Sequence, residues 1–137
     1  MFAQYMITNV TVYYEDTDAS GRVYYSNYLK YLERGRTDFL SSLGFSHKEL
    51  YNNNKIYFVV KTCNIEYVKP ANFEDILEIN TSIVSFSKAK IEFNQQILRD
   101  DQLIVDSNII IVSINNENKI SKMPNEMLEI LAQHQIK

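Results

Sequence analysis

Acidic residues and a glycine fall close together in one stretch of the chain, which reads YYEDTDASGRVYYSNYLKYLERGR from Tyr13 to Arg36. Patterning puts the end of a strand before the acids and the start of a helix after them. A carboxylate therefore comes near the free N–H groups of a helix start, which carry partial positive charge and can bind a developing oxyanion. Asp18 is the candidate. It could attack a carbonyl carbon directly or draw a proton from attacking water, and both routes suit acyl transfer.

Each residue of this stretch also has a structural interpretation. An aspartate before a helix is often an N-terminal cap or a turn residue, and the residue pattern alone favours that interpretation of Asp18. Ser26 or Asn27 can cap the helix, and Asn27 can alternatively position a water. Gly21 either makes a plain turn or permits the close backbone approach that a site in a turn requires.

Other site chemistries find little support in the sequence. His47, His134 and Cys63 lack metal-ligand spacing, and no C-x-x-C or H-E-x-x-H pattern occurs, so no metal site is expected. A G-x-S-x-G nucleophile elbow and a glycine-rich phosphate loop are also missing. Cys63 falls on the apolar parity of a strand, which predicts a buried and inert thiol.

Length and composition further limit the possible fold, partners and location of the protein. The 137 residues are expected to form a single domain, 1–137, and 45% hydrophobic residues with only 3 Gly and 2 Pro argue against disorder. A net charge of -3 gives no general attraction to phosphate backbones, so no nucleic-acid partner is expected. The sequence has no apolar run long enough for a membrane span, and its start, MFAQYMITNV, lacks the features of a signal peptide. With one cysteine, these features predict a cytoplasmic protein.

Hydrophobic periodicity predicts the elements that hold the acidic stretch. A strand over residues 5–14 precedes it, and apolar residues at helical spacing predict a long helix over 26–43, which Gly44 ends. An Asn-rich turn at 52–54 leads into four runs with period-two patterning, over residues 56–68, 76–86, 90–98 and 103–114. Short connections between the later runs favour antiparallel hairpins. Pro124 then begins a terminal helix.

These elements suggest one economical architecture. A single long amphipathic helix buries its stripe only if the following sheet curls around it, so we expect an α+β fold with a sheet wrapped on one helix. An open sheet of this kind has edge strands with unpaired backbone N–H and C=O groups. A dimer in which edge strands pair would satisfy those groups. Gly35 lies inside the helical pattern at a cost of about 1 kcal/mol relative to Ala, which predicts close helix-to-sheet packing there.

The acidic stretch resembles the signature of a known family. Its run Y-E-D-T-D-A-S-G-R-V-Y-Y-S-N-Y-L-K-Y-L-E-R-G-R is similar to that of hotdog-fold acyl-CoA thioesterases of the 4-hydroxybenzoyl-CoA thioesterase and YbgC type. The matching residues are Asp16, Asp18, Gly21, Val23, Tyr24, Asn27, Tyr28 and Glu33. Weaker similarity continues through residues 66–71 and at Asp75. The resemblance implies a five-stranded antiparallel sheet around one long helix, with dimers that share a continuous sheet and often form tetramers.

The resemblance also assigns roles in catalysis. It makes Asp18, the second acid of the D-x-D pattern, the nucleophile or general base of thioester hydrolysis, and it makes Asp16 structural. The backbone N–H of Tyr25 matches the helix-start donor that polarises the thioester carbonyl. The YbgC branch usually has His where this chain has Tyr25. A neutral phenol there can orient a substrate by hydrogen bonding but is a poor proton acceptor.

Further positions are candidates for substrate binding. Glu33 matches an acidic position that faces the acyl pocket in some relatives, or it forms a structural ion pair with Arg34, Arg36 or another neighbour. Lys88 and Lys90 occupy a region that supplies phosphate contacts in aryl-CoA relatives, or they are ordinary solvated lysines.

The sequence therefore predicts a cytoplasmic acyl-CoA thioesterase that converts an acyl- or aryl-CoA thioester to the free acid and coenzyme A. Coenzyme A is part of the substrate, and no other cofactor is expected. The expected assembly is a homodimer or homotetramer. Two alternatives stay open, namely hydrolysis of an acyl-carrier-protein thioester and a noncatalytic module that binds acyl-CoA.

Overall fold

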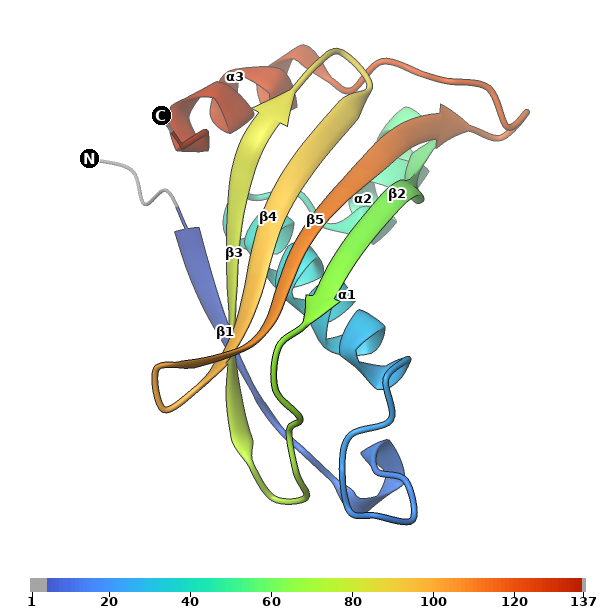
Figure 1. Ribbon diagram of the computed structural model, residues 1–137. Helices are drawn as coiled ribbons and strands as arrows, with labels where there is room; N and C mark the ends of the chain where they lie inside the picture. The colour runs from blue at the N-terminus through green and yellow to red at the C-terminus, as the bar shows by residue number, and fades with distance from the viewer. Residues whose placement is uncertain (1–4, 137) are drawn as a thin grey trace.

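A computed structural model describes residues 5–136, in which five antiparallel strands form a sheet that curls around one long helix (Figure 1). The elements are, in chain order, β1 (Tyr5–Thr11), the 3-10 helix η1 (Tyr14–Asp16), α1 (Asn27–Ser42), α2 (His47–Asn54), β2 (Ile56–Tyr67), β3 (Ile76–Phe86), β4 (Lys90–Arg99), β5 (Gln102–Asn115) and α3 (Asn125–His134). The strands follow the order β1-β3-β4-β5-β2, so β1 and β2 are the edges. The predicted α+β sheet of five antiparallel strands, with its long helix and terminal helix, is confirmed.

The core lies between α1 and the concave face of the sheet. The residues that α1 buries are Tyr28, Tyr31, Leu32, Gly35, Arg36, Phe39 and Leu40. Their spacing of three and four residues is that of one helix face. Alternate residues of β3, β4 and β5 are buried, and they form one apolar cluster with this face. The apolar face of the helix and the apolar face of the sheet thus pack together in a single core.

Gly35 brings α1 close to the middle of the sheet. A Cβ atom at this position would lie 2.7 Å from Ile79 Cγ2, 2.8 Å from Thr81 Oγ1 and 2.9 Å from Gln95 Nε2. Those separations are shorter than van der Waals contact. The predicted close packing of helix on sheet at Gly35 is therefore confirmed.

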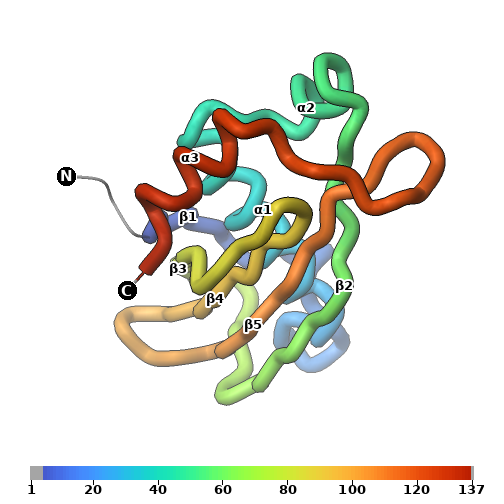
Figure 2. The backbone as a smooth tube through the Cα atoms, turned by 90° about the horizontal axis from the view of Figure 1, so that it is seen from above, coloured from blue at the N-terminus to red at the C-terminus, as the bar shows by residue number. Residues whose placement is uncertain are grey.

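The terminal helix α3 lies at the end of the sheet where the β3–β4 hairpin turns (Figure 1), and Figure 2 shows this end from above. The chain contacts the hairpin before α3, where Met123 N–H donates to Lys88 O over 2.8 Å. It contacts β3 again after α3, where Ile136 N–H donates to Ile83 O over 2.9 Å. Across residues 5–136, every helix is too short or too polar to cross a membrane.

Residues 47–54 differ from the prediction, because they form the helix α2 and the Asn-rich segment 52–54 is its last turn. Ser46 caps this helix, since its side chain accepts from Glu49 N–H over 3.1 Å. Lys55 ends it in the left-handed conformation, with φ of 57°. Ser46 and Glu49 make an S-x-x-E pair, a helix-start signature that is present in the sequence.

Cys63 is exposed, so the prediction of a buried thiol is wrong. It pairs with the buried Ile109 and therefore lies on the parity of the inner face, as its apolar neighbours suggested. However, β2 is an edge strand, and its residues 59–64 are all exposed. A period-two pattern identifies a face of a strand but does not reveal whether that strand lies at an edge.

Candidate active site

Asp18 lies in a tight turn within the connection from η1 to α1. Gly21 N–H donates to Asp18 O over 3.0 Å, and Asp18 N–H donates to Arg22 O over 2.8 Å, which closes a small hairpin. The carboxylate Oδ1 accepts from the Ser20 N–H at 2.8 Å and from the Ser20 hydroxyl at 2.5 Å. Asp18 is thus a turn residue, as the pattern favoured. Its other oxygen, Oδ2, has no hydrogen bond within the part of the chain that the structure describes.

These contacts keep the Asp18 side chain ionised. The Ser20 hydroxyl and then the Ser20 N–H stabilise the carboxylate form and lower the pKa of Asp18 below its ordinary value. The side chain is also exposed. At neutral pH Asp18 is therefore a carboxylate with one oxygen held and one oxygen free, and the free oxygen can accept a proton or attack an electrophile.

Gly21 is required by the conformation of this turn. Its φ of +81° lies in the left-handed region, which residues with a Cβ rarely adopt. A Cβ built at Gly21 would meet no atom within 4 Å. The structure thus shows the turn, and the close backbone approach of a substrate at Gly21 stays a prediction.

The hairpin that carries Asp18 is fixed by the segment between β2 and β3. Val23 N–H donates to Ala71 O over 2.9 Å, and Phe73 N–H donates to Gly21 O over 3.0 Å. In the sequence, this segment shows only weak similarity to the family signature and carries no predicted role. Backbone hydrogen bonds hold the segment in place. Because such bonds require no particular side chain, they could not be predicted from residue types.

Tyr28 joins the same segment to α1. Its Oη accepts from Ala71 N–H over 3.0 Å, and the residue is 3% exposed. Its ring centroid lies 5.5 Å from that of Tyr67 at the end of β2. Burial raises the pKa of Tyr28, so its hydroxyl is neutral at neutral pH. Helix, segment and hairpin therefore form one connected unit around the candidate carboxylate.

The start of α1 leaves backbone donors free. Ser26 occupies the N-cap position, but its side chain makes no capping hydrogen bond. Asn27 Nδ2 donates instead to Asp16 O over 2.8 Å, so the prediction that Ser26 or Asn27 caps the helix is wrong. Over residues 5–136, the N–H groups of Tyr25 and Ser26 donate no hydrogen bond. Free N–H groups at a helix start can hold a negatively charged oxygen.

The Tyr25 side chain is 60% exposed and belongs to a small group of tyrosines. Its ring centroid lies 4.7 Å from that of Tyr24. Tyr67 Oη donates to Tyr25 O over 3.4 Å, which ties the end of β2 to the start of α1. Burial raises the pKa of Tyr67, so this hydroxyl keeps its proton at neutral pH.

Glu33 borders a small cavity between α1 and β2, here called the α1–β2 pocket, whose volume is about 170 Å³. The lining includes Glu33, Arg36 and Thr37 of α1, His47 of α2, and Val59 and Val60 of β2. Thr37 Oγ1 donates to Glu33 Oε1 over 3.1 Å. The alternative of an ion pair with Arg34 or Arg36 is wrong for this chain, since neither cation lies within ion-pair distance among the residues described.

Lys88 and Lys90 lie away from the Asp18 hairpin. They belong to the β3–β4 hairpin beside α3, whereas the connection that carries Asp18 is at the opposite end of the sheet (Figure 1). One chain thus places Asp18, Gly21 and Tyr25 in a single connection, with Asn27 at the start of α1, but does not bring the two lysines to it.

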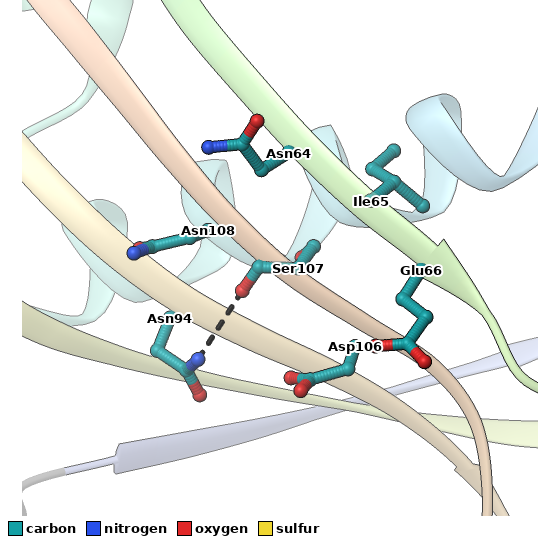
Figure 3. Close-up of a pocket in the computed structure, with 7 residues that line it drawn as sticks. All are labelled: Asn64, Ile65, Glu66, Asn94, Asp106, Ser107 and Asn108. Carbon is teal, nitrogen blue, oxygen red and sulfur yellow. Dashed lines mark hydrogen bonds between the residues drawn. The ribbon is translucent and has the colours of Figure 1, made fainter.

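A larger hollow, about 400 Å³ in volume, lies over β2, β4 and β5. Figure 3 shows its lining, which is Asn64, Ile65, Glu66, Asn94, Asp106, Ser107 and Asn108. Asn94 Nδ2 donates to Ser107 O over 3.2 Å across it. Asp18 lines neither this hollow nor the α1–β2 pocket. Within residues 5–136, no cluster of three or more His, Cys, Asp or Glu is placed to hold a metal ion.

Comparisons with known proteins agree with this fold. The family model of the thioesterase-like superfamily matches residues 12–131. The acyl-CoA thioesterase YbgC of Haemophilus influenzae is 36% identical over 106 residues, which cover 77% of this chain and 78% of that protein. The crystal structure of a probable thioesterase from Bartonella henselae matches with a TM-score of 0.85 at 33% identity, covering 88% of this chain and 99% of that one. A structure of 4-hydroxybenzoyl CoA thioesterase matches with a TM-score of 0.87 at 19% identity, covering 94% and 99%, which supports the predicted hotdog fold.

Proposed function

Because the chain belongs to the thioesterase-like superfamily and is a thioester hydrolase, we propose that it hydrolyses acyl-CoA thioesters with Asp18 as its catalytic carboxylate. The products are a carboxylic acid and coenzyme A, and the reaction needs no metal or redox cofactor. The Haemophilus influenzae relative, an acyl-CoA thioesterase, supports the choice of substrate. The single cysteine suits a reducing compartment, and we place the enzyme in the cytoplasm.

The observation that carries this proposal is a free carboxylate oxygen and free N–H donors in the same connection. The Tyr25 N–H holds the thioester carbonyl oxygen as negative charge develops on it. Asp18 Oδ2 takes a proton from a water whose oxygen bonds to the carbonyl carbon. The tetrahedral intermediate then collapses, the C–S bond breaks, and the thiolate of coenzyme A leaves and takes up a proton. In the covalent alternative, Oδ2 itself bonds to the carbon, the C–S bond breaks and the coenzyme A thiolate leaves, and water then hydrolyses the resulting anhydride to the free acid and the Asp18 side chain.

The proposed site also needs a second copy of the chain. Asp18 is exposed and lines neither of the two cavities described above, so we propose that a second copy of the chain encloses the substrate beside it. The edge strand β2 has six consecutive exposed residues, 59–64, and an unpaired edge of this length tends to pair with another strand. We propose a homodimer in which two β2 strands pair and the partner completes the site. A homotetramer would stack two such dimers.

The second copy also accounts for the two lysines. Coenzyme A is strongly anionic, and this chain is acidic, with a net charge of -3, so basic side chains must gather locally where the phosphates bind. Lys88 and Lys90 lie at the far end of their own sheet from Asp18 (Figure 1). We therefore propose that the lysines of one protomer serve the Asp18 site of its partner.

A panel of thioesters tests the proposed function. Acyl-CoAs with short, long and aryl acyl groups and matched acyl-carrier-protein thioesters are incubated with the enzyme, and free thiol is followed with a thiol reagent. Because Cys63 is exposed in one chain and a free thiol can react with the reagent, the Cys63→Ser variant is the enzyme used. We expect catalytic release from at least one acyl-CoA. Binding without release, or turnover of carrier-protein thioesters alone, would overturn the proposal.

A further inference from the structure

Arg36 is a charged side chain inside the fold that the chemistry proposed for Asp18 does not use. It lies on the face of α1 that meets the sheet and is 8% exposed. Its Nη1 donates to Gln95 Oε1 over 3.0 Å. Gln95 is fixed in turn, because its Nε2 donates to Leu32 O over 2.8 Å and to Thr81 Oγ1 over 2.9 Å. The amide therefore presents its oxygen to Arg36 and holds the guanidinium in place.

The guanidinium of Arg36 makes one hydrogen bond within residues 5–136. It has five N–H donors and stays protonated in proteins, and Gln95 uses one of those donors. No carboxylate in the described part of the chain lies within ion-pair distance of it. Glu33, one turn earlier on α1, accepts from Thr37 instead. The guanidinium lines the α1–β2 pocket, and its remaining donors are not among the buried unpartnered groups of the described residues, so they are open to an acceptor that enters that pocket.

These donors border the α1–β2 pocket, which suits the distal end of an acyl group. Its volume of about 170 Å³ is room for roughly five water-sized groups. Apolar side chains of Leu40, Phe58 and Val59 make up much of its wall and can hold a hydrocarbon chain. Arg36 lies nine residues after the first residue of α1, a distance of about 13 Å along the helix axis. An acyl chain of this length that starts at the free N–H groups would reach the pocket.

We propose that Arg36 selects acyl groups whose end remote from the thioester is a carboxylate, so that the preferred substrates are coenzyme A half-thioesters of dicarboxylic acids. The carboxylate enters the α1–β2 pocket and accepts hydrogen bonds from the guanidinium, a pairing in which both oxygens can take part. This inference rests on the proposed function, because it takes the thioester carbonyl to lie at the start of α1.

Glu33 modulates this selection. Its carboxylate lines the same pocket and opposes a second negative charge there. Glu33 is exposed, however, so water screens its charge, whereas the charge of the buried Arg36 is screened much less. Attraction by Arg36 therefore exceeds repulsion by Glu33. It follows that Glu33→Gln increases the preference for a carboxylate end.

The test compares acyl-CoAs of equal chain length that end in a methyl, a hydroxyl or a carboxylate group. Wild-type kcat/KM is expected to be at least about tenfold higher for the carboxylate end than for the methyl end, as a hydrogen bond to a charged group warrants. Arg36→Met should remove this advantage and leave the methyl-ended substrate within about threefold of wild type. Arg36→Lys should restore part of it. Arg34→Met, at an exposed position on the same helix, is the control and should change neither value.

The outcomes separate this inference from the proposed function. The wild-type comparison needs no variant, so it decides the matter even if Arg36→Met does not fold. A wild-type preference for the methyl or hydroxyl end, or an equal loss on all three substrates in a folded Arg36→Met enzyme, overturns the role of Arg36 but leaves thioester hydrolysis standing. If Arg36→Met dissociates the dimer but leaves the order of preference among the three substrates unchanged, the group that accepts hydrogen bonds from Arg36 belongs to a second copy of the chain. The inference is again wrong in that case. Failure to hydrolyse any thioester contradicts the proposed function itself.

Discussion

One neighbour, Ser20, sets how far the pKa of Asp18 is lowered. Both hydrogen bonds to Oδ1 come from Ser20, and they lower the pKa of Asp18, with the hydroxyl contributing most. The carboxylate therefore persists to a lower pH than in a free aspartate, whose pKa is about 3.9. If catalysis needs the carboxylate, kcat/KM falls only when the pH drops through this lowered pKa.

The variant Ser20→Ala tests this dependence. Loss of the hydroxyl removes the largest cause of the lowered pKa, so the pKa of Asp18 rises and the acid limb of the pH profile of kcat/KM moves to higher pH. The plateau near neutral pH is kept, because Asp18 is still ionised there. Ser87→Ala, at an exposed position in the β3–β4 hairpin, is the control and should leave the profile in place. An acid limb that does not move in Ser20→Ala would show that Asp18 does not set it.

Asp18 also shows how far residue types alone can predict a site. The residue pattern favoured a turn residue, and the structure has that turn. The catalytic interpretation uses Oδ2 and the turn uses Oδ1, so the two do not exclude each other. Residue types could not establish this, because the free oxygen and the free Tyr25 N–H depend on how backbone hydrogen bonds from residues 71–73 hold the hairpin.

At the scale of elements, Tyr28 is the link between α1 and the segment that holds the hairpin. Tyr28→Phe removes the acceptor of Ala71 N–H, and a buried donor without a partner costs about 1–3 kcal/mol. We expect a lower unfolding temperature together with a fall in kcat/KM, because the hairpin of Asp18 loses part of its support.

Tyr57→Phe is the matched control. Its hydroxyl donates to Asn118 Oδ1 over 2.9 Å at an exposed site away from α1, so its loss should leave kcat/KM unchanged. Unfolding temperatures from calorimetry and rates from thiol release give the two readouts. If Tyr28→Phe keeps full activity and stability, the hairpin is held by the backbone contacts alone.

Gly35 sets the distance between α1 and the sheet. An alanine there would gain about 1 kcal/mol of helix propensity, but its Cβ would lie within 3 Å of side chains on β3 and β4. Overpacking of a core costs about 1–3 kcal/mol, so Gly35→Ala should lower the free energy of unfolding, as denaturant titration measures it. Ser41→Ala, exposed on the same helix, should not lower it. A more stable Gly35→Ala protein would contradict the close packing.

The elements that were predicted correctly are those with a strong period. The stripe of α1 and the alternation in β3, β4 and β5 are each buried on one face, and burial is what produces the pattern. The helix α2 was missed because it is short and polar and buries only Leu50, so its period is weak. Its Ser46–Glu49 cap was the available signal.

At the scale of the whole molecule, the edge strand β2 has no neighbouring strand on its outer side in one chain. The sequence could not predict it, because the period-two pattern of β2 does not depend on which strand becomes its neighbour. Cys63 was expected to be buried because it falls on the apolar parity of β2. Its exposure in one chain follows from the edge position of that strand. Pairing of β2 with a second copy would cover this strand.

A charge placed on β2 tests the dimer. Val60 is 52% exposed in one chain, and Val60→Glu would put two like charges into a paired interface, which should reduce the mass in solution from twice the 16.1 kDa of one chain to that of a single chain. Light scattering after size exclusion measures this. Ile120→Glu, at a position that is 74% exposed outside the sheet edges, should keep the wild-type mass. An unchanged mass in Val60→Glu would place the interface elsewhere.

The most direct test of the central claim is the turnover number of Asp18→Asn on the best acyl-CoA substrate. Asparagine keeps Oδ1 as an acceptor for Ser20, so the turn is preserved while the carboxylate is lost. We predict a kcat at least about 100-fold below wild type, with unchanged mass and unfolding temperature. Glu15→Gln, which removes an exposed acid from η1, should retain full activity. Undiminished turnover by purified Asp18→Asn would contradict the account.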